Sequence, residues 1–259
     1  APRKNTAFTY DSDGLVLTIT ETDTTSHSVP YSTNGQTRVW TFGYTTASGV
    51  KQLTSIDGPR TGVSDVTSYL YTAAGYLSRI TNAVGHQIAI TSHDGMGRPL
   101  SITDQNGVVT DLEYNARGWL TKSTVRHGTG DAVTTIEYSL AGDVTKVTLP
   151  DGSFLDYTYD DARRLTVITN QSGETIEFIY DLARNVTALV TKDSGGTVKR
   201  TQSRAYDELS RLLRTIGAAT QTTTFGYDNN SNLVSLTDPL AKTTSFGFDA
   251  LNRLITATN

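Results

Sequence analysis

Carboxylates recur at one place along this chain and are the first residues whose type and spacing could do chemistry. Most directly follow an aromatic residue: Asp11, Asp94, Asp160, Asp181, Asp207, Asp228 and Asp249. Stacked turns could align them for Ca²⁺, which prefers oxygen ligands. An Asp in the first place of a turn also accepts backbone N–H groups without a metal. The Gly-Gly-x-Gly-x-Asp spacing of calcium-binding repeats is missing, and Thr45, Thr72, Asn115 and Ser139 interrupt the series. We therefore favour the capping role.

Other chemistry-bearing residues show no catalytic spacing. The four histidines are His27, His86, His93 and His127, and none forms an i, i+4 pair. His93 takes the place of a repeated aromatic, which predicts a planar structural substitute. Motifs for a serine nucleophile, a phosphate loop or a zinc protease are absent from the sequence. A glycosidase needs a pair of carboxylates in one cleft, and none of the repeated Asp residues differs in its sequence context from the others. We expect a non-enzymatic protein with no catalytic, cofactor or metal site.

Composition narrows the class of protein further. The chain has 259 residues, 22 Lys+Arg against 26 Asp+Glu, a net charge of −4 and no Cys. Basic residues are scattered, which argues against nucleic-acid binding because that requires clustered cations. Without Cys, disulfides and thiol chemistry are excluded. The 36% hydrophobic content predicts a thin core, and abundant Thr, Val, Ile, Tyr and Phe favour strands. We expect an all-β protein with almost no helix.

A repeat of about 21 residues organises the chain. Its aromatic position, counted as 0, falls at Tyr10, Tyr44, Tyr71, His93, Tyr114, Tyr138, Tyr159, Tyr180, Tyr206, Tyr227 and Phe248. Gly is frequent at +4, Leu or Val at +6, and an aliphatic-Thr pair at +9 and +10. Asx followed three residues later by Gly indicates a type I turn, and each unit has two such places, as in 94–97 and 104–107. Each unit therefore predicts one β-hairpin and its following turn.

Strand parity predicts how the hairpins stack. Positions −2 and 0 share a face and are large and apolar in most units, as in Tyr157 and Tyr159, so we expect rows of aromatic rings between hairpins. Positions +6 and +9 differ by an odd number, which predicts a bulge near the +4 Gly or apolar residues on both faces. Residues 205–217 also fit a helical spacing, but their repeat register favours a strand. Basic residues near +5 to +8 should pair with turn carboxylates: Arg98, Lys146, Arg164, Arg211 and Arg253.

We expect a single array over residues 1–259, irregular in 1–70 and regular in 71–259. The insertions 21–38 and 57–67 interrupt the first part and are either binding loops or a cap that blunts the end of the sheet. No segment has the roughly 18 apolar residues of a membrane helix. The first residues carry neither an initiator Met nor a signal sequence, so we expect the chain to be a piece of a longer protein. Open sheet edges predict self-association at high concentration.

The repeated segments resemble the Rhs or YD-repeat family. The resemblance rests on Tyr159-Asp160 through Leu165, Tyr227-Asp228 through Asp238, Phe248-Asp249 through Leu254, and His93-Asp94 through Arg98. It covers residues 71–259 and extends more weakly to Tyr10. The resemblance implies a strip of stacked hairpins that spirals into a hollow β-sheet shell. In bacterial Rhs toxins and the C component of Tc toxins such a shell encloses a C-terminal toxin, whereas teneurins and wall-associated proteins carry similar repeats in an adhesion setting.

The resemblance implies a shell segment that shields a downstream toxin domain of the same parent chain in a bacterial secreted protein. A secretion apparatus or a cell surface would be a further partner, and the location would be secreted or at the cell surface. The alternative is a surface adhesion or carbohydrate-binding module in which Trp40 and Trp119 stack on sugar rings. Trp119 lies directly after the turn glycine Gly118, and we expect it to pack against the next hairpin.

Overall fold

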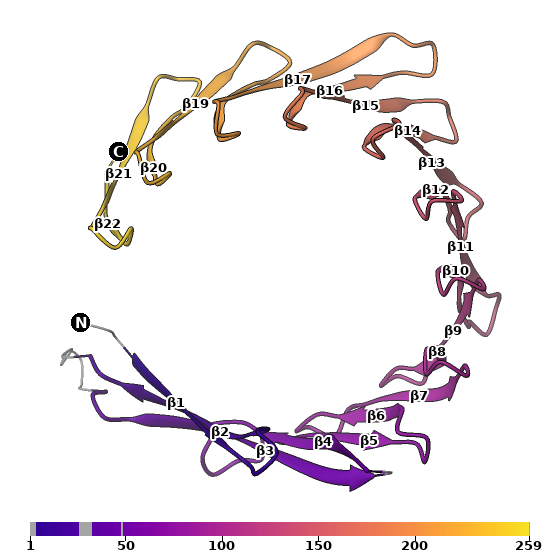
Figure 1. Cartoon of the computed structure of the whole chain (residues 1–259). Coiled ribbons are helices and arrows are strands. Elements are labelled where there is room, and N and C mark those ends of the chain that lie inside the picture. Colours follow the sequence, from indigo (N-terminus) through magenta and orange to yellow (C-terminus); the bar gives the residue numbers. More distant parts are fainter. Residues whose placement is uncertain (1–3, 26–32, 48, 259) are drawn as a thin grey trace. The chain divides into compact units, whose positions relative to one another are not determined.

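The computed structural model describes residues 4–25, 33–47 and 49–258, and these contain 22 antiparallel strands and no helix (Figure 1). The all-β prediction is confirmed, and 205–217 holds a strand rather than a helix. In the described residues no helix is long and apolar enough to cross a membrane. The chain divides into two compact units, Ala1–Val133 and Thr134–Asn259.

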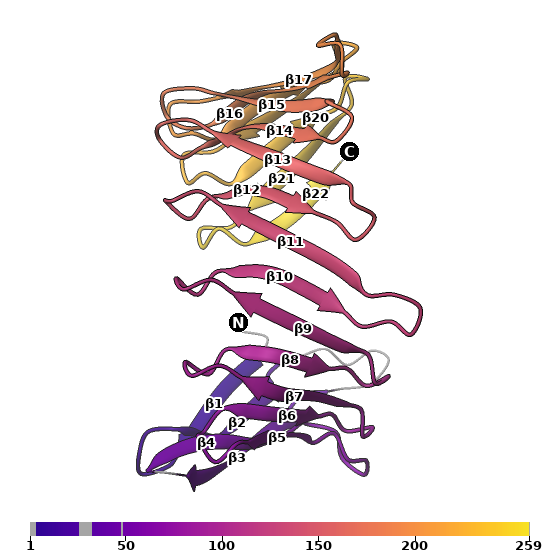
Figure 2. The same ribbon diagram turned by 90° about the vertical axis from the view of Figure 1, so that its right-hand side faces the viewer.

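The first unit is a run of strands in which each pairs with the next along the chain (Figure 2). Short turns join most neighbours, so strand order follows chain order. The strands are β1 (Lys4–Tyr10), β2 (Val16–Asp23), β3 (Thr37–Ala47), β4 (Val50–Asp57), β5 (Thr67–Tyr71), β6 (Leu77–Thr81), β7 (Gln87–His93), β8 (Pro99–Thr103), β9 (Val109–Tyr114) and β10 (Leu120–Val125).

The second unit repeats this arrangement more regularly, again with sequential antiparallel pairing. Its strands are β11 (Ala132–Tyr138), β12 (Val144–Thr148), β13 (Phe154–Tyr159), β14 (Leu165–Asn170), β15 (Thr175–Tyr180), β16 (Val186–Lys192), β17 (Val198–Tyr206), β18 (Leu212–Ile216), β19 (Thr222–Tyr227), β20 (Leu233–Thr237), β21 (Thr243–Phe248) and β22 (Leu254–Thr258). The prediction of one hairpin per repeat is confirmed.

Both turn signals of the repeat form the predicted turns. In the first, the Gly97 N–H bonds to the Asp94 carbonyl at 3.0 Å; in the second, the Gly107 N–H bonds to the Asp104 carbonyl at 3.0 Å. The fourth turn residue adopts positive φ, +81° at both Gly97 and Gly107, where glycine lacks the Cβ clash of other residues. In the second unit the same place is often not glycine, as at Arg184 and Thr220.

A bulge brings all the apolar repeat positions to one face. Tyr159 pairs with Leu165, but Thr158 pairs with Val167, which leaves Thr166 at +7 without a ladder partner. The same one-residue shift occurs beside the repeated aromatic in every described pair of strands whose first strand contains that aromatic. Because side chains alternate along a strand, the shift returns position +9 to the face of +6 and 0. The predicted bulge exists, but it lies at +7 rather than beside the +4 Gly, which forms the turn itself.

The described residues form no buried hydrophobic core. None of their apolar side chains is buried, and the one buried residue is Thr124, at 6% exposure. Many strands in each unit are instead half-buried along their whole length, as in β6, β8, β12, β14, β16 and β20. Each unit is therefore a single layer, and its stability must come from contacts between neighbouring hairpins.

Candidate functional site

The turn carboxylate caps the backbone of its own hairpin. Asp160 Oδ1 accepts the N–H groups of Ala162 at 3.0 Å and Arg164 at 2.9 Å, and Oδ2 accepts Arg164 Nε at 2.7 Å. The Arg164 backbone N–H is the largest cause that holds the pKa of Asp160 below its usual value, against partial desolvation. The same three bonds recur at Asp94, Asp207 and Asp249. The capping role and the Arg–Asp pairing are confirmed. For Lys146 the predicted pairing with a turn carboxylate is wrong, because its ammonium group lies 3.6 Å from Asp156, a residue within strand β13.

The same arginine reaches the next hairpin. The Arg164 guanidinium carbon lies 4.7 Å from the centre of the Tyr180 ring, and Nη1 donates to the Asp181 carbonyl at 3.4 Å. Arg211 does the same at Tyr227, with distances of 4.9 and 3.0 Å, and Arg98 covers Tyr114 at 4.8 Å. We call this set the repeat latch: the Asp at +1, the Arg at +5 and the aromatic ring of the following repeat.

At three junctions the latch takes the place of the predicted contact between aromatic rings. Tyr114, Tyr180 and Tyr227 contact a guanidinium group of the preceding hairpin rather than an aromatic ring. A cation over a ring face adds electrostatic attraction to the contact. The sequence does contain a signal for this contact: each of the three arginines precedes its ring by 16 residues. Alternation along a strand does not reveal it, because the two residues lie in different hairpins.

The tyrosine hydroxyl makes a second contact with the preceding hairpin. Tyr159 donates to the Val144 carbonyl at 2.9 Å and Tyr180 to the Leu165 carbonyl at 2.8 Å. Both acceptors are at position +6 of the preceding repeat, beside the bulge. Burial is the largest cause that raises the pKa of Tyr159. His93 makes the equivalent contact, with Nε2 2.9 Å from the Leu77 carbonyl. The prediction that His93 replaces the aromatic structurally is confirmed.

The remaining histidines and both tryptophans do not converge on one site. His86 and His127 are exposed in turns, and His27 lies outside the described residues. Trp40 is half-buried in β3, opposite Ile19 of β2. Trp119 is half-buried, with the Arg117 guanidinium 5.1 Å from its ring centre. Within the described residues no group of three or more His, Cys, Asp or Glu is placed to hold a metal ion.

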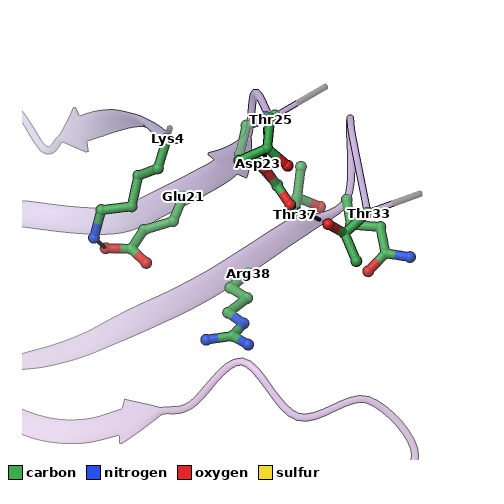
Figure 3. Close-up of a pocket in the computed structure, with 9 residues that line it drawn as sticks. Lys4, Glu21, Asp23, Thr25, Thr33, Thr37 and Arg38 are labelled. Carbon is green, nitrogen blue, oxygen red and sulfur yellow. Dashed lines mark hydrogen bonds and ion pairs between the residues drawn. The ribbon is translucent and has the colours of Figure 1, made fainter. Parts of the chain in front are cut away.

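A pocket of about 440 Å³ lies beside the first insertion (Figure 3). Lys4 from β1 forms an ion pair with Glu21 of β2, and the Thr33 hydroxyl donates to Asp23. Arg38 contributes a second basic group, so charges of both signs line the space. Residues 26–32 of this insertion lie outside the described residues. In the second insertion, the Arg60 N–H bonds to Asp65 Oδ2 at 2.9 Å. That these insertions are binding loops or a cap of the sheet stays a prediction.

Sequential antiparallel hairpins, with a junction that recurs between several of them, define a repeat protein. The sequence model of the Teneurin YD-shell family matches residues 41–192, and that of the RHS repeat matches residues 206–243. The chain belongs to the YD-shell family, as its repeated segments predicted. No curated protein matches the chain.

Solved structures show the same fold. The TcdB2–TccC3–Cdc42 crystal structure matches with a TM-score of 0.64 and 18% identity, over 96% of this chain and 16% of that chain. The Tc holotoxin pore of Photorhabdus luminescens, with TccC3 mutation D651A, matches with a TM-score of 0.62, 18% identity and the same coverage. TcdB2–TccC3 without the hypervariable C-terminal region matches at 0.64 and 18%, also over 96% and 16%. The chain thus spans about one sixth of those chains.

Proposed function

We propose that residues 1–259 act as one array in the wall of a YD shell that encloses a toxin domain located downstream in the same parent chain. The observation that carries this proposal is the single sheet layer without a buried core in the described residues, with the repeat latch at three of the junctions between repeats. Such a sheet gains area by adding repeats. That architecture suits a wall better than a catalytic cleft.

The similarity to solved structures also supports a role in a shell wall. One similar structure is of TcdB2–TccC3 lacking a hypervariable C-terminal region, and a variable region after a constant shell fits a wall that protects exchangeable cargo. The corresponding location is a bacterial secreted or surface protein, with a secretion apparatus or cell surface as further partner. The shell role needs no catalytic residue, and we propose that this segment is not an enzyme.

The adhesion alternative receives less support from the two tryptophans. A sugar platform needs an open ring face, but Trp40 and Trp119 are half-buried, and a guanidinium lies against the Trp119 ring. Trp40→Ala and Trp119→Ala are therefore expected to leave binding to immobilised glycans unchanged. Saturable glycan binding that either substitution abolishes would favour the adhesion module instead.

The test is limited proteolysis of the parent protein, followed by mass spectrometry of the region downstream of the repeats. Native shell should protect that region, and urea sufficient to unfold the shell should expose it. The matched control is the same parent carrying Arg164→Ala and Arg211→Ala, which removes two latches and should speed digestion of the cargo. If the native parent loses its downstream region as fast as the isolated region is digested, the wall encloses nothing and the proposal fails.

A further inference from the structure

Leucine side chains project from a row of turns along one side of the second unit. Its strands pair in chain order and alternate in direction, so the turns that follow the repeated aromatic all lie on one side of the sheet (Figure 2). We call this row the first-turn rim; its turns are 139–142, 160–163, 181–184, 207–210, 228–231 and 249–252. Four of these six turns have a leucine at a central place. The rim leucines are Leu140, Leu182, Leu209 and Leu251.

The rim leucines are exposed and concentrated on this side of the sheet. Leu182 is 105% exposed, Leu140 89%, Leu251 73% and Leu209 70%. Central places of turns usually favour polar residues, glycine or proline. In the described turns on the opposite side of the unit, Leu240 is the one leucine at a central place. Side chains this exposed contribute little to the packing of the sheet, and their recurrence along one rim indicates a contact outside the fold.

The spacing of the rim leucines suits a fluid, flat surface better than a protein groove. Neighbouring turns of the rim are separated by two strands, or about 9.5 Å. Leu182 and Leu209 lie in neighbouring turns, and Leu140 and Leu251 each lie two turns further along, at about 19 Å from the nearer of them. Single side chains spaced this widely form no contiguous apolar patch, but each can enter a lipid layer by itself.

The turns that carry the leucines have few polar backbone groups left to desolvate. The Ser210 N–H bonds to the Asp207 carbonyl at 3.0 Å, and Asp207 Oδ1 accepts the N–H groups of Leu209 and Arg211, each at 2.9 Å. The Asp207 carboxylate also pairs with the Arg211 guanidinium at 2.6 Å. The turn at 249–252 repeats these bonds. Satisfied N–H groups and paired carboxylates lower the cost of moving a turn out of water.

The charge of the rim selects the kind of lipid. In the six turns and the residue after each, eight carboxylates stand against five cations. The carboxylates are those of Asp143, Asp160, Asp161, Asp181, Asp207, Glu208, Asp228 and Asp249, and the cations are Arg163, Arg164, Arg184, Arg211 and Arg253. An acidic rim is repelled by anionic headgroups. Zwitterionic lipid is therefore the surface that this rim fits.

We propose that the rim leucines bind the second unit to the surface of a zwitterionic lipid bilayer. Each leucine enters the boundary between headgroups and acyl chains, while the sheet stays outside the membrane. The contact buries apolar area that the fold itself leaves in water. It goes beyond the shell role, because it assigns a partner to the turns rather than to the sheet.

Co-sedimentation of the chain with phosphatidylcholine vesicles tests the proposal. The unmodified chain should bind, and binding should persist in about 0.5 M NaCl because apolar burial is not screened. The test variant, Leu182→Ser with Leu209→Ser, should lower the partition coefficient about tenfold to a hundredfold. The matched control, Leu149→Ser with Leu240→Ser, changes exposed leucines on the opposite side of the sheet and should leave binding unchanged. Both variants should keep the urea midpoint of the unmodified chain, so lost binding does not report unfolding.

No co-sedimentation at about 5 mM lipid, an equal loss in both variants, or stronger binding to vesicles that contain phosphatidylserine would each overturn the proposal. Light scattering without lipid supplies a further check. A mass that falls in the test variant but not in the control would assign the rim leucines to contacts between copies of the chain, and would also overturn it. The shell proposal is tested by cargo protection in the parent protein, so either can fail alone.

Discussion

Backbone strain at the turns of the second unit gives a prediction with a definite sign. Thr220 closes the turn between β18 and β19 with φ of +64°, and its side chain is exposed. Non-glycine residues pay about 1–2 kcal/mol in this left-handed region, and a β-branched side chain suits it least. Glycine removes that cost but loses about 0.5–1 kcal/mol more backbone entropy on folding. Thr220→Gly should therefore stabilise the chain by about 0.5–1 kcal/mol.

The assay is urea unfolding followed by far-ultraviolet circular dichroism. With an m-value of about 2–3 kcal/mol/M, the gain corresponds to a rise of roughly 0.2–0.4 M in the urea midpoint. Thr220→Ala is the matched control, because it removes the branched side chain but keeps the Cβ clash, and it should recover only part of the gain.

The reverse change tests the same reasoning at a second turn. Gly152 has φ of +83°, and no atom lies within 4 Å of an added Cβ, so Gly152→Ala isolates the cost of the conformation from any steric contact. It should destabilise the chain by about 1 kcal/mol. If Thr220→Gly is no more stable than Thr220→Ala, or if Gly152→Ala is neutral, the φ-based account of these turns is refuted.

Three further predictions concern the junctions between repeats. Tyr159→Phe removes the bond to the Val144 carbonyl and should cost about 1 kcal/mol in urea unfolding, whereas an unchanged midpoint would show that the hydroxyl contributes nothing. Arg164→Ala should lower the midpoint more than Arg164→Lys, because lysine keeps the charge but not the fork that reaches both Asp160 and the Asp181 carbonyl; equal effects would contradict the latch geometry. The carboxyls of Asp160, Asp207 and Asp249 have folded-state pKa values below the ordinary 3.8, so their stabilisation is complete above 3.8 and is lost as pH falls through the lower folded values. Stability should decline below about pH 4, and acid titration by circular dichroism that shows no decline would contradict this.

The repeat period predicted most of the fold because it combines signals that act locally. Asx and Gly at fixed places determine the turns, as at 94–97, since side-chain capping and positive φ involve only a few neighbouring residues. Alternation then predicts which side chains share a face, as for Tyr157 and Tyr159. The structural role of His93 could be predicted for the same reason, because its position in the repeat determines its neighbours.

The bulge and the latch required the tertiary structure. Parity showed that +6 and +9 conflict, but only the observed pairing of Thr158 with Val167 places the extra residue at Thr166. The Arg164–Tyr180 contact joins two hairpins, and its geometry depends on how far the sheet advances between them. Aromatic rows and Arg–Tyr rows are equally compatible with the sequence spacing. The contact could have been anticipated only from the repeated interval of 16 residues.

By itself, the sequence determined the hairpin repeat, its turns and the role of each carboxylate as a cap, because these depend on contacts within a few residues. The tertiary structure alone decided the position of the bulge and the contact of the Arg98, Arg164 and Arg211 guanidinium groups with the following ring. The physical reason is that pairing between strands, unlike turn formation, depends on register, and a shift of one residue changes which side chains meet.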